Sequence, residues 1–119
     1  MDKNGYKKLV VWQKAIDLTV NIYRLTERLP SEEKYGLTSQ MRRCAVSIAS
    51  NLAEGSKRAT DKDFRNFVLI ALGSSAELET QLIIVERLKL VDDKRFGEVL
   101  MELDAVMKML NKLQLRLRG

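Results

Sequence analysis

Histidine is absent from the 119-residue sequence, which removes the side chain on which many catalytic and metal sites depend. Without it the chain lacks the usual general base, the usual zinc ligand and the Glu-x-x-His motif of di-iron helical bundles. The acidic residues do not replace it, because no two of them are three residues apart and only Glu98 and Glu102 are four apart. A cage for a magnesium ion would need a second such pair, so we interpret this one as part of a solvated helix face.

Other catalytic and cofactor-binding patterns are missing as well. The sequence contains neither a Gly-x-x-x-x-Gly-Lys nor a Gly-x-Gly-x-x-Gly pattern for binding phosphates. Its single cysteine, Cys44, cannot form an internal disulfide and has no histidine to activate it, so we interpret it as a small buried thiol. We therefore expect a protein that is not an enzyme and that binds no cofactor or metal.

Proline and long apolar runs are also scarce. Proline occurs once, at Pro30, and glycine lies mainly where chain reversals are expected, which favours long helices with short connections. No apolar run approaches the roughly 18 residues that a membrane-spanning helix needs, and no signal-like apolar core follows the first residues. With 45% apolar and 31% charged residues, we expect one cytoplasmic domain over residues 1–119, folded in water and not bound to a membrane.

Apolar residues recur at alternating spacings of three and four in four stretches of the chain. This period is typical of helices packed against partners, and it predicts helices over about residues 9–29, 37–55, 61–89 and 92–118. Short connections make neighbouring helices antiparallel. The predicted fold is therefore all-α, an antiparallel up-and-down four-helix bundle.

Particular residues predict where these helices begin, end or approach one another. We expect Gly55 to cap the end of the second helix and Asp92 to cap the start of the fourth. Thr60 with Asp63 resembles a capping box at the start of the third helix. The small residues 73–76 within that helix are interpreted as a notch where a neighbouring backbone packs closely.

Several predicted helices are apolar over more of their circumference than one neighbour within the chain would cover. The surplus residues are Val10, Val46, Leu69, Ile70, Ile83, Ile84 and Met109. We interpret them as a surface buried between copies of the chain, which predicts self-association. The alternative is that they are ordinary apolar residues scattered over a protein surface.

Basic residues exceed acidic ones by five, and the excess gathers at one end of the predicted bundle. That end, formed by the N-terminus, the second connection and the C-terminus, holds 12 basic and 5 acidic residues (+7), whereas the rest holds 9 and 11 (−2). A cationic pole of this kind favours binding of nucleic acid, and we prefer RNA. The candidate contacts are Lys7, Lys8, Lys57, Arg58, Lys62, Arg65, Lys108, Lys112, Arg116 and Arg118, with Lys3 and Lys14 completing the basic set.

Two considerations limit this interpretation. Aromatic residues are few, and those present fall on core stripes, so recognition would be of backbone shape rather than of stacked bases. The alternative is that cations near helix C-termini are favourable without any ligand and aid solubility.

A second polar feature is a pair of arginines in the predicted second helix. In an antiparallel hairpin, Arg42 and Arg43 come within reach of Glu77 and Glu79 in the third helix. We favour an ion pair of Arg43 with one of these glutamates, inside the bundle or at a subunit contact, because an unpaired arginine there would be costly. The alternative is that the arginines clamp a phosphate.

Four segments of the sequence together resemble a known family. They are residues 11–15 (VWQKA), 35–43 (YGLTSQMRR), 47–55 (SIASNLAEG) and 70–79 (IALGSSAELE). The resemblance is to the four-helix bundle proteins encoded in intervening sequences of bacterial 23S rRNA genes, sometimes labelled a ribosomal protein. These are related to the accessory variability protein of diversity-generating retroelements. The resemblance implies an up-and-down bundle assembled as a homopentameric ring.

The same resemblance implies a function and a set of polar positions. The function is binding of structured RNA, or recruitment of a nucleic-acid enzyme such as a reverse transcriptase by a protein scaffold whose charge is incidental. The family's polar positions, structural or at an interface, would be Gln40, Arg42, Arg43, Asn51, Glu54, Gly55, Glu77 and Glu79. Ala49 and Cys44 depart from the common pattern, which has proline and alanine there.

Overall fold

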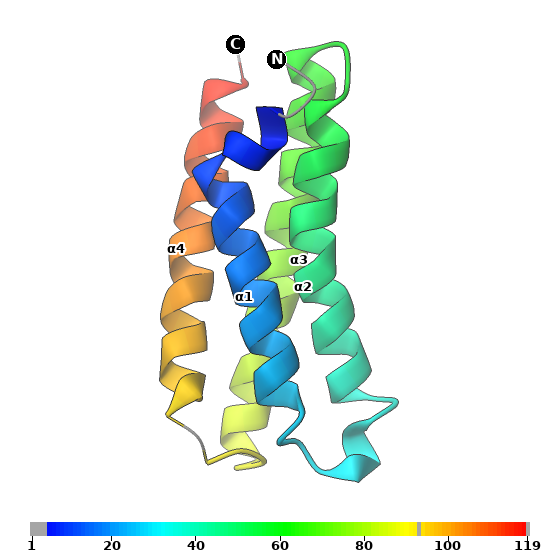
Figure 1. The fold of residues 1–119 in the computed structure, drawn as a ribbon, viewed down its shortest axis with the longest axis vertical. Coiled ribbons are helices and arrows are strands. Elements are labelled where there is room, and N and C mark those ends of the chain that lie inside the picture. The colour runs from blue at the N-terminus through cyan, green and yellow to red at the C-terminus, as the bar shows by residue number, and fades with distance from the viewer. Residues whose placement is uncertain (1–4, 93, 119) are drawn as a thin grey trace.

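The computed structural model describes residues 5–92 and 94–118 as an all-α bundle. Its four α-helices are α1 (Val10–Thr26), α2 (Leu37–Ser56), α3 (Asp61–Arg87) and α4 (Arg95–Arg116). Short 3-10 helices precede α1 (η1, Gly5–Lys8) and α2 (η2, Ser31–Glu33). Figure 1 shows the four helices running up and down side by side, in a body that measures 43 × 22 × 20 Å. The predicted all-α four-helix bundle is confirmed.

Each helix contacts the next one along the chain, and α4 returns to contact α1. The Cα atoms of α1 and α3 do not come within 8 Å of one another, so these two helices occupy diagonally opposite corners of the bundle. Because successive helices are antiparallel, η1, the α2–α3 connection and the C-terminal turn of α4 lie at one end (Figure 1).

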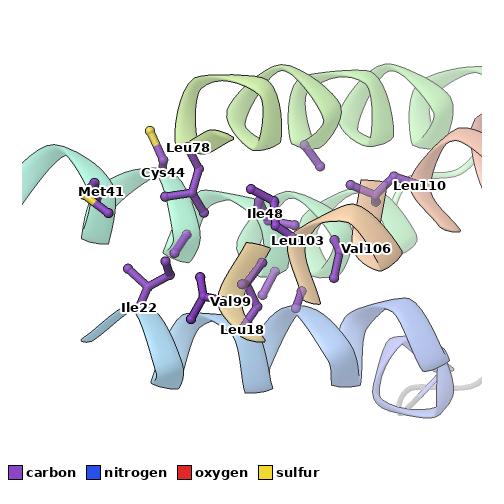
Figure 2. Packing of buried hydrophobic residues seen from close by; sticks show 14 of the residues in the cluster. Leu18, Ile22, Met41, Cys44, Ile48, Leu78, Val99, Leu103, Val106 and Leu110 are labelled. Atoms are coloured by element: carbon purple, nitrogen blue, oxygen red, sulfur yellow. The ribbon is translucent and has the colours of Figure 1, made fainter. Parts of the chain in front are cut away.

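The core consists of the residues that carry the three-and-four repeat. Figure 2 shows side chains from all four helices meeting along the axis of the bundle. The largest side chains with less than 2% exposure are Leu18, Ile22, Leu25, Met41, Ile48, Leu52, Val68, Leu78, Leu82, Val85, Leu103 and Leu110. Burying one such side chain contributes about 1.5–3 kcal/mol, so this seam supplies the main stabilising term.

The helix ends differ from their predicted positions by up to three residues. Thr60 accepts a hydrogen bond from the backbone N–H of Asp63 at 3.1 Å, which confirms the cap of α3. The prediction that Asp92 caps the fourth helix is wrong. Helix α4 begins at Arg95, and Lys94 occupies its N-cap position without a side-chain hydrogen bond. The carboxylate of Asp92 therefore lies too early in the chain to meet the first N–H groups of α4.

Gly55 also has a different role from the predicted one. It is a buried residue inside α2, which continues to Ser56. A Cβ atom at Gly55 would lie 2.6 Å from Cβ of Phe67 and 2.9 Å from Cδ1 of Phe64, both on α3. Glycine is therefore required here by the close approach of α3, not by a left-handed cap.

The close packing predicted for residues 73–76 is only partly present. Ser75 is fully buried, but a Cβ atom at Gly73 would meet nothing within 4 Å. Ala76 is exposed as well. The notch is therefore open at Gly73 and Ala76, on the outer face of α3, and closed at Ser75.

The outer face of α3 is unusually apolar. By length and composition alone, α3 could cross a membrane, although a single such helix is weak support because core helices of bundles have the same composition. Only 39% of its most apolar 18-residue window is buried within the chain. Of the seven surplus apolar residues, Met109 is partly buried against the core, and the others are exposed: Val10, Val46, Leu69, Ile70, Ile83 and Ile84.

The contact at Gly55 generates a stability prediction. We expect Gly55→Ala to lower the free energy of unfolding by about 1–3 kcal/mol, because the new methyl group overpacks the α2–α3 contact and Cβ of Phe67 cannot rotate away. Urea unfolding measures the change.

Gly97→Ala is the matched control. Gly97 lies on an exposed face of α4, and no atom of the described residues lies within 4 Å of its Cβ position. Alanine there should raise the free energy of unfolding by about 0.5–1 kcal/mol through helix propensity. Equal effects of the two substitutions would contradict the assignment of Gly55 as a packing glycine.

Candidate nucleic-acid interface

The ring of Tyr6 joins η1 to the α2–α3 connection at the basic end. The Nζ atoms of Lys57 and Lys7 lie 5.4 and 6.0 Å from the centroid of this ring. The ring also makes an edge contact with Trp12, at 5.4 Å between centroids. An aromatic ring attracts a cation lying over its face. Tyr6 therefore holds two candidate lysines, far apart in the sequence, on one small surface.

Arg65 joins the start of α3 to the end of α4. Its Nε atom donates to the backbone oxygen of Gln114 at 3.1 Å, and its terminal Nη2 donates to Oε1 of the same residue at 2.9 Å. Gln114 is buried and donates in turn to Oδ1 of Asn111 at 3.0 Å. Arg65 therefore fastens α3 to α4 through its Nε and Nη2 atoms.

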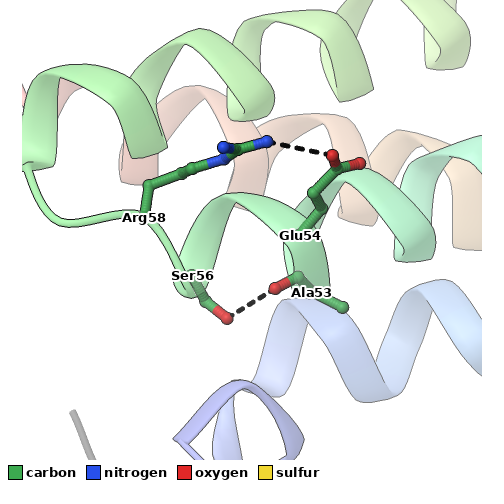
Figure 3. A network of polar contacts seen from close by, with 4 residues as sticks. All are labelled: Ala53, Glu54, Ser56 and Arg58. Carbon is green, nitrogen blue, oxygen red and sulfur yellow. Dashed lines mark hydrogen bonds and ion pairs between the residues drawn. The ribbon is translucent and has the colours of Figure 1, made fainter.

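Arg58 and Lys108 also have partners within the chain. Arg58 donates to Oε1 of Glu54 at 3.1 Å (Figure 3). Its guanidinium also lies 4.8 Å from the ring centroid of Phe67. Nζ of Lys108 lies 2.9 Å from Oδ2 of Asp104, and this hydrogen bond and charge raise the pKa of Lys108. Lys108 precedes Arg116 by eight residues, which places it about 12 Å along α4 from the end of the helix. It is the candidate farthest from that end.

The exposed candidates come from all the segments that meet at this end of the bundle. Those from η1 and the α2–α3 connection are Lys7, Lys8 and Lys57, and those from the start of α3 and the end of α4 are Lys62, Lys112, Arg116 and Arg118. Lys3 and Asp2, which entered the charge count from the sequence, lie outside the described residues. Phosphates could approach these cations from the open end of the bundle.

Two shallow hollows lie beside these cations. The first, about 410 Å³, lies between the start of α1 and the end of α4 and is lined by Lys8, Leu9, Val10, Val11, Met109, Lys112, Leu113 and Arg116. The second, about 470 Å³, is lined by Leu9, Asp61, Phe64, Leu113, Arg116 and Leu117. The sequence predicts Val10 and Met109 as surplus apolar residues but does not connect them with the basic end. The exposed Val10 beside Lys8 was the available signal.

The hairpin register predicted that Arg42 approaches α3, but Arg42 contacts α1 instead. Its Nε atom donates to Oγ1 of Thr26 at 2.8 Å, and its terminal Nη2 donates to the backbone oxygen of Tyr23 at 3.2 Å. Its guanidinium also lies 4.6 Å from the ring centroid of Tyr23. Arg42 therefore fastens α2 to the last turn of α1.

Arg43 is exposed, and the ion pair predicted inside the bundle is absent. Among the described residues it makes no ion pair with Glu77 or Glu79. Glu77 accepts instead from the thiol of Cys44 at 3.4 Å. Burial and then the neighbouring Glu77 raise the pKa of Cys44, so the thiol stays protonated and unreactive near neutral pH.

Polar residues continue along the seam between α2 and α3. Ser47 and Ser74 share a hydrogen bond of 2.9 Å, and Nδ2 of Asn51 donates to the backbone oxygen of Ser47 at 2.8 Å. Nε2 of Gln81 lies 3.5 Å from Oε1 of Gln40, while Oε1 of Gln81 is buried without a hydrogen-bond partner among the described residues. The resemblance-derived positions Gln40, Asn51 and Glu77 thus lie on this seam; Glu79 is only partly exposed.

The two glutamates spaced by four in the sequence, Glu98 and Glu102, have different surroundings in the structure. Glu98 is exposed, but Glu102 accepts from Nδ2 of Asn21 at 2.8 and 3.0 Å. Glu102 therefore joins α1 to α4 and does not belong to a solvated face. Within residues 5–92 and 94–118, no three His, Cys, Asp or Glu side chains are grouped as a metal site.

Comparisons with known proteins give a family and a related fold. Residues 7–112 match the sequence profile of the 23S rRNA-intervening sequence protein family. A crystal structure at 1.70 Å of a protein with unknown function, from the S23 ribosomal protein family of Bacteroides thetaiotaomicron VPI-5482, is also similar. It shares 25% identity and a TM-score of 0.81, over 88% of this chain and 98% of that chain. No functionally curated protein matches.

The different surroundings of Arg42 and Arg43 generate a prediction. We expect Arg42→Ala to lower the free energy of unfolding by about 1–2 kcal/mol, because it removes charge-assisted hydrogen bonds to Thr26 and Tyr23. Arg43→Ala, one residue away and exposed, should change it by less than about 0.5 kcal/mol. Urea unfolding compares the two variants, and a larger loss for Arg43→Ala would contradict this assignment.

Proposed function

The chain belongs to the 23S rRNA-intervening sequence protein family, and on this premise we propose that it is a non-catalytic, cytoplasmic homo-oligomer that binds structured RNA. The oligomer is a pentameric ring, and RNA meets the basic end of each bundle. One observation carries the proposal: η1, the α2–α3 connection, the start of α3 and the end of α4 bring exposed cations to the same end. Neutralising several phosphates at once is what gives a protein affinity for nucleic acid.

Helix dipoles do not explain all of this charge. An up-and-down bundle has two helix N-termini and two C-termini at each end, so its four dipoles largely cancel there. Lys57, Lys112 and Arg116 lie near C-termini, where a cation is favourable without a ligand. Lys62 lies in the first turn of α3, and Lys7 lies in η1, just before α1. A cation near a helix N-terminus is unfavourable. Their placement supports an anionic partner.

Self-association is supported by two apolar faces at opposite corners of the bundle. On α3, Leu69, Ile70, Ile83 and Ile84 are 39–52% exposed. On α1, Ile16, Val20 and Tyr23 are spaced by four and three and are 37–44% exposed. Two different faces on opposite sides suit a head-to-tail contact, which closes into a ring when the rotation between copies is suitable.

The open notch on α3 provides a test of self-association. Gly73→Arg places a long charged side chain in the middle of the apolar face, where nothing within the chain obstructs it. We expect this variant to remain folded and to sediment as a monomer, because the charge would be buried against the next copy.

Gly97→Arg is the control for this experiment. It adds the same side chain at another exposed helical glycine with nothing near its Cβ position. The Gly97→Arg protein should keep the sedimentation coefficient of the unmodified chain. A monomeric unmodified chain, or equal dissociation of both variants, would overturn the proposed α3 contact.

The basic end generates a prediction about salt. The double variant Lys112→Gln/Arg116→Gln should bind a fully paired hairpin RNA more weakly. Its plot of log affinity against log salt should be shallower by about 1.4–1.8, since each lost phosphate contact removes about 0.7–0.9 from the slope. Fluorescence anisotropy over a salt series measures both quantities.

A control removes the same charge from the opposite end of the bundle. Lys89→Gln/Lys94→Gln alters the α3–α4 connection and should leave the slope unchanged. If the unmodified chain shows no salt-dependent affinity, RNA binding is ruled out and a protein scaffold with incidental charge becomes the better explanation. In that alternative the apolar faces still mediate self-association, but the cations of the basic end bind no ligand.

A further inference from the structure

The hollow between α1 and α4 joins an apolar floor to a cationic rim. Val10, Met109 and Leu113 supply the floor, and Lys8, Lys112 and Arg116 stand around it. Val10 is 57% exposed although it lies amid charged residues, so it presents apolar surface to water at the most polar end of the molecule. Among residues 5–92 and 94–118, no carboxylate lines this hollow. Its occupant should therefore be apolar at its centre and negatively charged at its edge.

We propose that this hollow holds one unpaired base of the bound RNA, with the adjoining phosphates on Lys112 and Arg116. The inference rests on the proposed RNA binding and names the feature of RNA that the site selects. A nucleotide combines a flat, weakly polar face with an anionic phosphate, which matches the floor and the rim. Unpaired bases in loops and bulges can turn out of the helix, whereas bases in a duplex cannot reach such a hollow.

Size and shape favour a single nucleotide over an amphipathic helix. The volume of about 410 Å³ is in the range of roughly 300–1,000 Å³ typical of small-molecule sites. An amphipathic helix would need a continuous groove with anchors over several turns. Here the lining comes only from residues 8–11 and 109–116, about two turns of α4, and Leu9, Leu113 and Arg116 also border the second hollow. A guanidinium in this position can stack on a base or pair with a phosphate.

The absence of aromatic side chains from this hollow limits what it can recognise. The base would lie on aliphatic and thioether groups, which contact any base face and distinguish bases poorly. The site should therefore select for the unpaired state, not for the identity of the base. The site adds contact with one base to the expected recognition of the RNA backbone by its shape.

The test uses two hairpin RNAs that differ by one nucleotide. One is fully paired, and the other carries a single bulged 2-aminopurine, whose fluorescence reports its surroundings. Because the base would bury apolar surface of the floor, the unmodified protein should bind the bulged hairpin about five- to tenfold more tightly and change the 2-aminopurine signal. Val10→Asn should bring the affinity ratio to about one while leaving affinity for the paired hairpin and its salt dependence unchanged.

Leu115→Asn is the matched control. Leu115 is 50% exposed on the last turns of α4 and borders neither hollow. It should preserve the preference for the bulge. An unmodified protein without that preference overturns the base-binding site while leaving phosphate-based RNA binding intact. The base-binding site is also overturned if Val10→Asn weakens binding of both hairpins equally. The same holds if the Val10→Asn protein sediments as a dissociated oligomer. Failure of both hairpins to bind removes the proposed function and this inference together.

Discussion

Short connections force each helix of this protein to run antiparallel to the one before it, and the other features of the molecule depend on that constraint. It brings η1, the α2–α3 connection and the end of α4 together at one end, although about half the chain separates each of them from the next. It also places α1 and α3 at opposite corners. The cationic end and the two outward apolar faces are consequences of the same connectivity. A long crossover connection in place of one short loop would disperse the cations of the basic end and would change which helices lie at opposite corners.

Packing within this frame differs from seam to seam. The α2–α3 seam is the tightest at Gly55, where the helix backbone of α2 meets two phenylalanines of α3. Farther along, the same seam carries the Cys44–Glu77 and Ser47–Ser74 contacts, which are polar. Directional hydrogen bonds fix the register of two helices more strictly than apolar contacts do. This seam therefore sets how far α2 can slide against α3.

The apolar period of the sequence was sufficient to predict the helices and most of the core, because burial of one face is the dominant force on each helix. It was not sufficient to assign individual polar residues. Arg42 and Arg43 are adjacent, yet one turns toward α1 and the other toward solvent, since successive residues on a helix point about 100° apart. The hairpin register gave both the same neighbour. The register predicts the position of a residue along the helix axis but not the direction in which its side chain points around that axis.

Gly55 and Asp92 illustrate a related limit. A glycine near a helix end is usually a cap, and a carboxylate before a helix usually caps its start. Both assignments depend on the exact last or first residue, which a repeat of three and four cannot locate to within two residues. The hollow beside Val10 was harder still to foresee. It combines residues 8–11 with residues 109–116, and only the tertiary fold brings these together.

The orientation of copies decides what the basic end can do in the proposed oligomer. Copies related by a rotation axis parallel to the helices would all point their basic ends the same way, so five cationic surfaces would form one rim. Copies related by a twofold axis across the helices would place basic ends on opposite sides. A head-to-tail contact between the α1 and α3 faces is compatible only with the first arrangement. The same diagonal placement that exposes the apolar faces would therefore gather the cations, and the affinity of several weak sites on one RNA would multiply.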